Sequence, residues 1–178
     1  MNGNIQNALL VRRIKNGENE LTKELIIKNY ERVYKYLHYK TGDEHLAYDL
    51  TQETFLHLLT GIGNYYEKAH FNAYLMRIAH NVLIDYWKLR KEASSIEDIE
   101  FLLQMNTFED AVSDKDVLRR ALMKLPAEQR EAVLLKFVAG LKSREIAEIT
   151  NTNVSTVKSR IHLGKEKLKI ILKEEGIV

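Results

Sequence analysis

The sequence has no cysteine, a single proline and no long apolar run, and each absence narrows the class of protein. Without cysteine, the 178 residues cannot form disulfides or thiolate metal sites, which fits a reducing cytoplasm. No stretch approaches the roughly 20 apolar residues that cross a bilayer, and residues 1–17 lack the apolar core of a signal peptide. We therefore expect a cytoplasmic protein without direct membrane insertion.

Motifs of enzymes and metal proteins are also missing. The six histidines follow no metal-ligand spacing, and the sequence contains no glycine-rich phosphate cradle of the Walker type. Asp49 and Glu53 lie one helical turn apart, but no nucleophile or electrophile accompanies them. We expect no metal, no cofactor, no catalytic residues and no enzymatic activity of the chain's own.

The charges are distributed unevenly, although the formal net charge is only +2. Residues 1–92 hold 13 Lys/Arg and 11 Asp/Glu, a balance of +2, whereas residues 93–118 hold 1 and 7, a balance of −6. Residues 119–178 hold 13 and 7, a balance of +6. The basic C-terminal part suits a polyanion, and the acidic connector would be repelled by one.

Helical periodicity extends over almost the whole sequence, and no segment alternates convincingly like a β-strand. Gly42 is expected to end one helix, Asp43 to cap the next, and Pro126 to lie in the first turn of a later one. The pattern predicts an all-α fold of two small domains, 1–92 and 114–178, joined by an acidic linker at 93–113. The expected helices lie at about 5–15, 21–40, 43–59, 71–91, 115–124, 126–139, 143–150 and 154–174.

Residues 143–169 have the pattern of a helix, a tight turn and a second, basic helix. Asn151 suits the left-handed backbone of the turn, and Asn153, or failing it Ser155, can cap the second helix. The buried side of this unit is expected to hold Ile146, Ala147, Ile149, Val157, Ile161 and Leu168. The outer side would carry six polar or basic side chains that can contact phosphates and base edges in a major groove, namely Ser155, Thr156, Lys158, Ser159, Arg160 and Lys165. This segment predicts a helix-turn-helix that binds duplex DNA.

Two further segments combine an apolar stripe with polar side chains. In 71–91, Tyr86 and Trp87 lie beside cations, which suits single-stranded nucleic acid because each unstacked base can stack on a ring for about 1–3 kcal/mol. The alternative is that both rings pack at the core and the basic helix end is solvated. In 47–59, Asp49, Gln52 and Glu53 share one helix face, which fits a basic helix of another protein or, alternatively, only solvent.

In this order, the three segments resemble the sigma factors of bacterial RNA polymerase, in particular the extracytoplasmic-function (ECF) group of the sigma-70 family. The resemblance covers about residues 21–172. "DLTQETF" is similar to the segment of that group that binds core polymerase, and "YLMRIAHNVLIDYWKLRK" to the segment that melts and reads the −10 promoter element. "LPAEQREAVLLKFVAGLKSREIAEI", followed by "STVKSR", is similar to the domain that reads the −35 element. The resemblance implies a region 2-like and a region 4-like domain and a role in transcription initiation.

The resemblance also implies roles for individual residues. The clamp helices of the polymerase's largest subunit would be contacted by Asp49, Gln52, Glu53 and Phe55. The single-stranded −10 element would be handled by Arg77, Asn81, Asp85, Lys88, Arg90 and Lys91, with a flipped base captured near Asn64, Tyr65 and Tyr66. The duplex −35 element would be read by Lys158, Ser159 and Arg160, within the outer side of the last helix. An anti-sigma factor is a further implied partner.

Some residues depart from the family pattern. His162 is followed by Leu163 and Gly164, where arginine and alanine are common, so a DNA contact is lost and the helix is expected to be weaker by about 1 kcal/mol. The linker length is consistent with the family, because 21 residues can extend to about 70 Å and elements about 17 base pairs apart lie roughly 58 Å apart.

Two other functions remain open. One is a transcriptional regulator that binds duplex DNA as a dimer without polymerase, and the other is a protein-interaction module with incidental basic charge.

Overall fold

The computed structural model describes residues 3–66, 70–93 and 114–176, and every regular element in these ranges is a helix. The first half contains α1 (Gly3–Lys15), α2 (Leu21–Thr41), α3 (Glu44–Gly61), the short 3-10 helix η1 (Ile62–Asn64) and α4 (Phe71–Ala93). The second half contains α6 (Asp114–Met123), α7 (Ala127–Phe137), α8 (Ser143–Ile149) and α9 (Val154–Glu174). The prediction of an all-α fold is confirmed, and the helix limits agree within about two residues, as expected at frayed ends.

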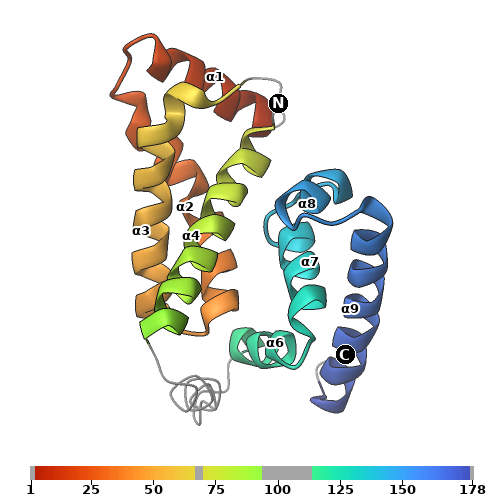
Figure 1. Cartoon of the computed structure of the whole chain (residues 1–178). Coiled ribbons are helices and arrows are strands. Elements are labelled where there is room, and N and C mark those ends of the chain that lie inside the picture. The colour runs from red at the N-terminus through yellow and green to blue at the C-terminus, as the bar shows by residue number, and fades with distance from the viewer. Residues whose placement is uncertain (1–2, 67–69, 94–113, 177–178) are drawn as a thin grey trace.

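The N-terminal bundle consists of α2, α3 and α4 packed lengthwise, with α1 lying across one end (Figure 1). Its core is formed by side chains that recur at helical spacing and are fully or almost fully buried, among them Leu25, Val33, Tyr36, Leu37, Leu50, Leu58, Leu75, Ala79 and Leu83. Tyr30 and Tyr34 of α2 are only half-buried. Tyr36 takes the central position instead.

Local signals set the ends of these helices as the sequence predicts. Gly42 ends α2 in the left-handed conformation, with φ 71°, and its N–H donates to the carbonyl of His38 at 2.8 Å. The Asp43 carboxylate accepts from the N–H of Leu46 at 3.0 Å and so caps α3. Pro126 lies one residue before α7, with extended backbone, and not within its first turn. The predicted linker lies outside the described residues except for its first residue, which ends α4.

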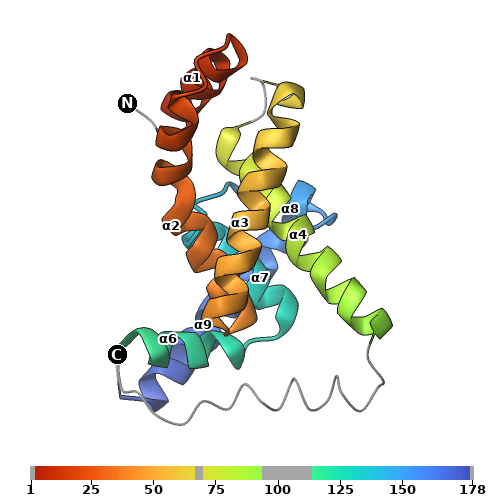
Figure 2. The same cartoon turned by 90° about the vertical axis from the view of Figure 1, so that its left-hand side faces the viewer.

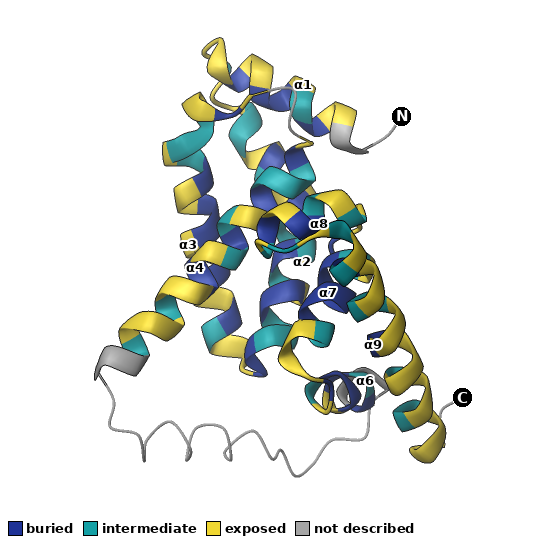
Figure 3. Ribbon diagram, turned by 45° about the vertical axis from the view of Figure 1, so that its right-hand side comes forward, coloured by how far each residue is buried: buried dark blue, intermediate teal, exposed yellow. Residues whose placement is uncertain are grey.

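In the C-terminal bundle α7 and α9 pack side by side, α8 lies at one end of the pair and α6 at the other (Figure 1). The two bundles are in contact, because α7 packs on α2, α8 packs on α4 and α6 reaches α2 (Figure 2). One cluster of buried apolar side chains includes members of both bundles, and Figure 3 shows buried residues on α2, α4 and α7 where they meet. Among the helices described, none has both the length and the apolarity needed to cross a membrane.

Candidate nucleic-acid and partner interfaces

The turn between α8 and α9 is built by backbone hydrogen bonds and one left-handed residue. The N–H of Thr150 donates to the carbonyl of Ile146 at 2.9 Å, and Asn151 follows with φ 49°. The Asn153 side chain then accepts from the N–H of Thr156 at 2.8 Å and from the Ser155 hydroxyl at 2.6 Å. Asn153 is therefore the cap of α9, and the tight turn positions α9 across α8, as the sequence indicates.

The outer side of α9 carries all six polar and basic residues that the sequence assigns to duplex DNA. Four of them are exposed, namely Ser155, Lys158, Ser159 and Lys165, whereas Thr156 and Arg160 are half-buried. Arg160 forms an ion pair with Glu128 of α7 at 2.6 Å, which holds its guanidinium near the start of that helix. Leu163 is 48% exposed on the same helix. The surface is thus basic with short hydroxyl side chains, a composition that can contact both phosphates and base edges.

Gly164 has a different role from the one that the sequence indicates. It is buried, and a Cβ at this position would lie 2.7 Å from Val133 Cγ2 and 3.3 Å from the Gln129 carbonyl oxygen. The absence of a side chain lets α9 approach α7 closely. The glycine is therefore not simply a weak point of α9, because tertiary packing requires it.

The C-terminal half of α4 presents rings and charges together. Trp87 is 40% exposed and packs edge-on against the half-buried Tyr86 at 5.3 Å between ring centroids. The Arg90 guanidinium lies 5.9 Å from the centre of the Tyr86 ring and donates to its hydroxyl. Asn81, Asp85 and Lys88 are exposed around the rings, whereas the side chain of Lys91 lies outside the described part of α4. The exposed Trp87 ring, which packs on a tyrosine that Arg90 holds, can stack with an unpaired base.

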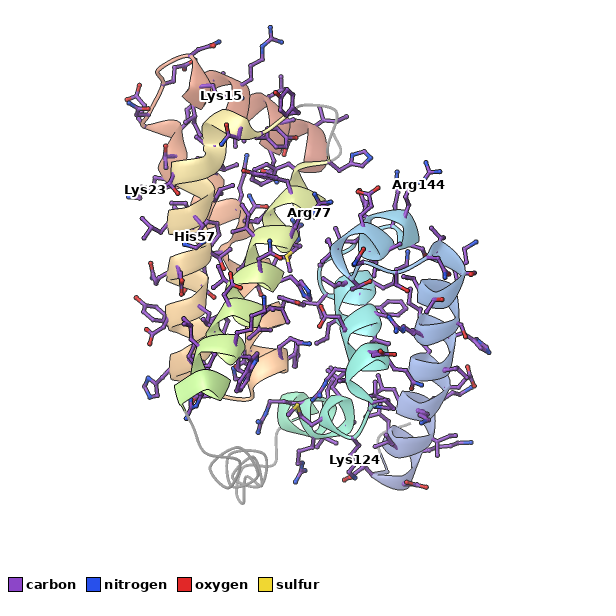
Figure 4. The ribbon with its side chains drawn as sticks, viewed as in Figure 1. Lys15, Lys23, His57, Arg77, Lys124 and Arg144 are labelled. Atoms are coloured by element: carbon purple, nitrogen blue, oxygen red, sulfur yellow. The ribbon has the colours of Figure 1, made fainter. Side chains whose placement is uncertain are left out.

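Arg77 lies nearer the start of α4, on the side that faces the C-terminal bundle (Figure 4). Its guanidinium donates to Glu148 of α8 at 3.3 Å, so this candidate DNA contact is engaged by an acidic residue of the helix-turn-helix. Sequence reasoning did not predict this pair, because the two residues lie 71 positions apart.

The segment before α4 separates the three candidates for base capture. Tyr65 is only 3% exposed and packs against Phe71 and Tyr74, with ring-centroid distances of 5.8 and 5.1 Å. Its carbonyl accepts from the ammonium of Lys15 in α1 at 2.9 Å. The Tyr65 ring is therefore part of the core in this structure, and its role in base capture stays a prediction. Asn64 and Tyr66 are exposed, the latter by 80%, and remain the candidates.

The polar face of α3 is present, with one exception. Asp49, Gln52 and Glu53 are exposed, but Phe55 is 4% exposed and stacks on Tyr30 at 6.1 Å, so it does not face a partner in this conformation. Two apolar residues of α3, Tyr48 and Leu56, are 51% and 60% exposed, and sequence reasoning did not include them in this face. Both lie one helical turn from Gln52, and this i, i+4 spacing could have revealed them.

Known proteins share this arrangement of elements and segments. The family model for sigma-70 region 2 matches residues 25–93, and that for sigma-70 region 4 matches residues 115–168. The ECF RNA polymerase sigma factor SigW of Bacillus subtilis is 28% identical over 92% of this chain and 95% of its own length. The ECF RNA polymerase sigma factor SigM of the same organism is 32% identical over 78% of this chain and 87% of its own length. This chain belongs to the ECF sigma factors.

A solved structure shows the same fold. The sigma factor RpoE of Bartonella quintana, in complex with the anti-sigma factor NepR, matches with a TM-score of 0.69 over 85% of this chain and 96% of that one, at 22% sequence identity. In the ECF sigma factor described here, region 2 corresponds to α2–α4 and region 4 to α6–α9, whereas α1 precedes both matched ranges.

The sigma factor also contains a buried carboxylate that sequence reasoning missed. Glu131 of α7 is 7% exposed and accepts from the Tyr36 hydroxyl at 2.6 Å and from the Lys40 ammonium, while His80 Nδ1 lies 3.2 Å from the same oxygen as Tyr36. Burial alone raises the pKa of Glu131, but the hydrogen bond with His80, the charge of Lys40 and the Tyr36 hydroxyl outweigh it and lower the pKa to about 2. Burial and the Glu131 charge also raise the pKa of Tyr36 well above its usual value. No signal in the sequence could have revealed this group, which we call the Glu131 cluster, because its partners come from two distant helices.

Proposed function

We propose that this sigma factor binds core RNA polymerase in the cytoplasm and directs promoter-specific transcription initiation without catalysis of its own. The observation that carries the proposal is the order of the two family matches on one chain, each of which includes an exposed helix face suited to nucleic acid. In this proposal α9 reads the duplex −35 element. The C-terminal half of α4 and the residues before α4 bind the single-stranded −10 element.

The described side chains support a division of labour within α9. Lys158 and Lys165 are exposed cations seven residues apart, about two helical turns, and are suited to phosphates that flank the site. Ser155 lies in the first turn of α9 and Ser159 in the second, where short hydroxyl groups can approach base edges. We assign base reading to the first two turns and phosphate contacts to the cations.

The exposed carboxylate and amide face of α3, with Asp49, Gln52 and Glu53, is the proposed contact with core polymerase. It is separate from the DNA faces because it lies on another helix of the N-terminal bundle. An anti-sigma factor is a further proposed partner. Its support is the relative from Bartonella quintana, which shares the fold and was solved with such a protein.

Transcription with purified components tests the proposal. The protein is mixed with bacterial core polymerase that lacks any sigma factor, and transcripts are sequenced from a library of genomic fragments. Specific transcripts that require the protein are expected, and their start points would define the promoter. Absence of a polymerase complex, together with tight dimeric binding to duplex DNA, would contradict the proposal and favour a conventional regulator.

Two charge-reversal variants then separate the assigned faces. Lys158→Glu with Arg160→Glu should abolish promoter-specific transcription and leave polymerase binding intact, whereas Asp49→Lys with Glu53→Lys should weaken polymerase binding itself. The matched control is Lys167→Glu with Lys169→Glu, which makes the same charge change at exposed positions of α9 on the C-terminal side of all the assigned residues. If the control loses transcription as completely as the Lys158 and Arg160 variant, overall charge and not the assigned face controls binding.

A further inference from the structure

Helix α1 precedes both matched family ranges, yet it contacts the elements on either side of the candidates for base capture. It lies across the end of the N-terminal bundle, against η1 and the beginning of α4 (Figure 1). The ammonium of Lys15, in the last turn of α1, donates to the carbonyl of Tyr65 at 2.9 Å (Figure 4). Asn7 Nδ2, in the first half of α1, donates to Oδ1 of Asn72 at 3.4 Å. Helix α1 is therefore bonded to the residue that follows η1 and to the first turn of α4.

A buried pair of amides fixes the position of α1 on the bundle. Asn7 and Asn29 of α2 are 5% and 1% exposed, and each side chain donates to the other, at 3.0 and 3.3 Å. The Asn29 amide also donates to the carbonyl of Leu25 at 2.8 Å. Buried amides need such partners, so a shift of α1 along the bundle would leave polar groups unsatisfied.

The two contacts of α1 are separated by a rigid spacer. Asn7 and Lys15 are eight residues apart in one helix, which corresponds to about 12 Å along its axis. The Tyr65 backbone is thereby held at one end of α1, while its ring is buried in the core. The residues on both sides of Tyr65, namely Asn64 and Tyr66, are exposed, the latter by 80%. Fixing Tyr65 therefore also fixes the backbone from which these two side chains extend.

We propose that α1 positions the base-capture residues, with Lys15 and Asn7 as positioning residues that hold Tyr65 and the beginning of α4 at a set separation. Asn64 and Tyr66 are then ordered before a flipped base arrives. Unstacking a base costs free energy, and a site that is already ordered loses less entropy on binding, so positioning raises the affinity for that base. The inference rests on the proposed function, because it assumes that this segment receives a base of the −10 element.

A direct contact between Lys15 and a phosphate would give a different result from positioning. Such a contact would weaken binding of every single-stranded probe equally and reduce the salt slope by about one unit. Loss of positioning would weaken binding only where a base is present at the captured position. Asn7 is uncharged and buried, so its replacement tests positioning without removing a cation from the surface.

Binding of abasic probes tests the proposal. The full chain in complex with core polymerase binds a single-stranded oligonucleotide with the non-template −10 sequence that the transcripts define, and an abasic nucleotide replaces each base in turn. One position in the parent should lose affinity on the order of 10-fold, because stacking and capture are lost there. Lys15→Met and Asn7→Leu should remove most of this difference and leave the affinity for the abasic probe unchanged. Lys15→Arg, which keeps a charged donor, should restore it.

The matched control is Lys28→Met. It removes one cation from the same bundle, where Lys28 forms an exposed ion pair with Glu24 at 2.7 Å on α2. This variant should discriminate between the intact and abasic probes as the parent does. Circular dichroism melting checks that each variant is folded, and Lys15→Met alone suffices if Asn7→Leu does not fold, because residue 15 lies at the surface.

Amide hydrogen exchange of the free chain, followed by NMR, tests the positioning without DNA or polymerase. The Tyr65 N–H donates to the carbonyl of Ile62 at 3.2 Å. Lys15→Met should accelerate its exchange on the order of 10-fold, as expected when a hydrogen bond from a charged donor is lost nearby. The Thr150 N–H, bonded to Ile146 in the C-terminal bundle, should exchange as in the parent. Equal acceleration at both amides would show a general loss of stability and overturn the positioning role.

The two failures are distinguishable. A parent complex without any position sensitive to base removal would contradict base capture in the proposed function, and the positioning role would fall with it. A parent with such a position, combined with variants that keep the full difference, would overturn the role of α1 alone. Equal losses for intact and abasic probes in Lys15→Met would show a phosphate contact, and loss of discrimination in Lys28→Met would show an effect of overall charge. Either result would also overturn the proposal.

Discussion

Replacement of Gly164 by alanine separates the effect of helix propensity from that of packing. In an isolated helix, Gly164→Ala should stabilise α9 by about 1 kcal/mol. In the folded protein, the new Cβ would lie 2.7 Å from Val133 Cγ2 and 3.3 Å from the Gln129 carbonyl oxygen. Val133 is 4% exposed and β-branched, so it cannot move aside easily. Overpacking of this kind costs typically about 1–3 kcal/mol, and the contact with a backbone atom places this site in the upper part of that range.

The expected net result is a loss of about 1–2 kcal/mol, equivalent to a decrease in Tm of roughly 2–8 °C. Thermal and urea unfolding followed by circular dichroism would measure it, with attention to whether the C-terminal bundle unfolds separately. Val133→Ala alone should cost about 2 kcal/mol through lost burial and a cavity. The double variant should be more stable than the sum of the two changes by about 1 kcal/mol or more, because the two sites share one contact. An increase in Tm for Gly164→Ala alone would refute the packing argument.

The structure also predicts the direction of change for three other perturbations. In the folded protein the pKa of Glu131 falls from an ordinary 4.5 to about 2. The ionised carboxylate therefore contributes about 3 kcal/mol to the free energy of unfolding above pH 4.5, and this contribution is lost as the pH decreases toward 2. Urea unfolding across this range should show the loss, and Glu131→Gln should remove most of the pH dependence. Lys15→Met deprives the Tyr65 carbonyl of its donor and should weaken binding of a single-stranded −10 probe several-fold, with duplex −35 binding unchanged in a mobility-shift assay. Leu163→Arg adds an exposed cation to α9 and should steepen the salt dependence of −35 binding by about one unit of slope in a log–log plot.

The helices and the helix-turn-helix could be predicted because their signals are local. Gly42, Asp43, Asn151 and Asn153 each act on backbone within four residues, and the structure shows each in the predicted conformation or bond. The polar and basic side chains of α9 follow from the same periodicity. Such features depend on neighbours along the chain, so a single sequence contains the information needed to place them.

The parts of the candidate site that sequence reasoning placed wrongly depend on tertiary neighbours. Tyr65 and Phe55 look like exposed aromatic candidates in sequence, but each is buried by rings that belong to other helices. Gly164 looks like a helix defect until α7 lies beside it. Glu131 occupies an ordinary position in an amphipathic helix, and its partners lie 91 and 95 residues away in α2. Helical periodicity gives the side of a helix that is buried, but not which helix covers it.

The chemistry of the Glu131 cluster also explains how the contact between the two bundles can be specific without a large gain in stability. A buried ion pair adds little net stability compared with well-packed apolar residues, because both charges lose their hydration. An apolar centre of the same volume would hold the bundles together more firmly. Replacement of both Lys40 and Glu131 by apolar residues of similar volume should therefore leave the stability measured by urea unfolding unchanged or higher, whereas replacement of either one alone should lower it, because an unpaired buried charge remains.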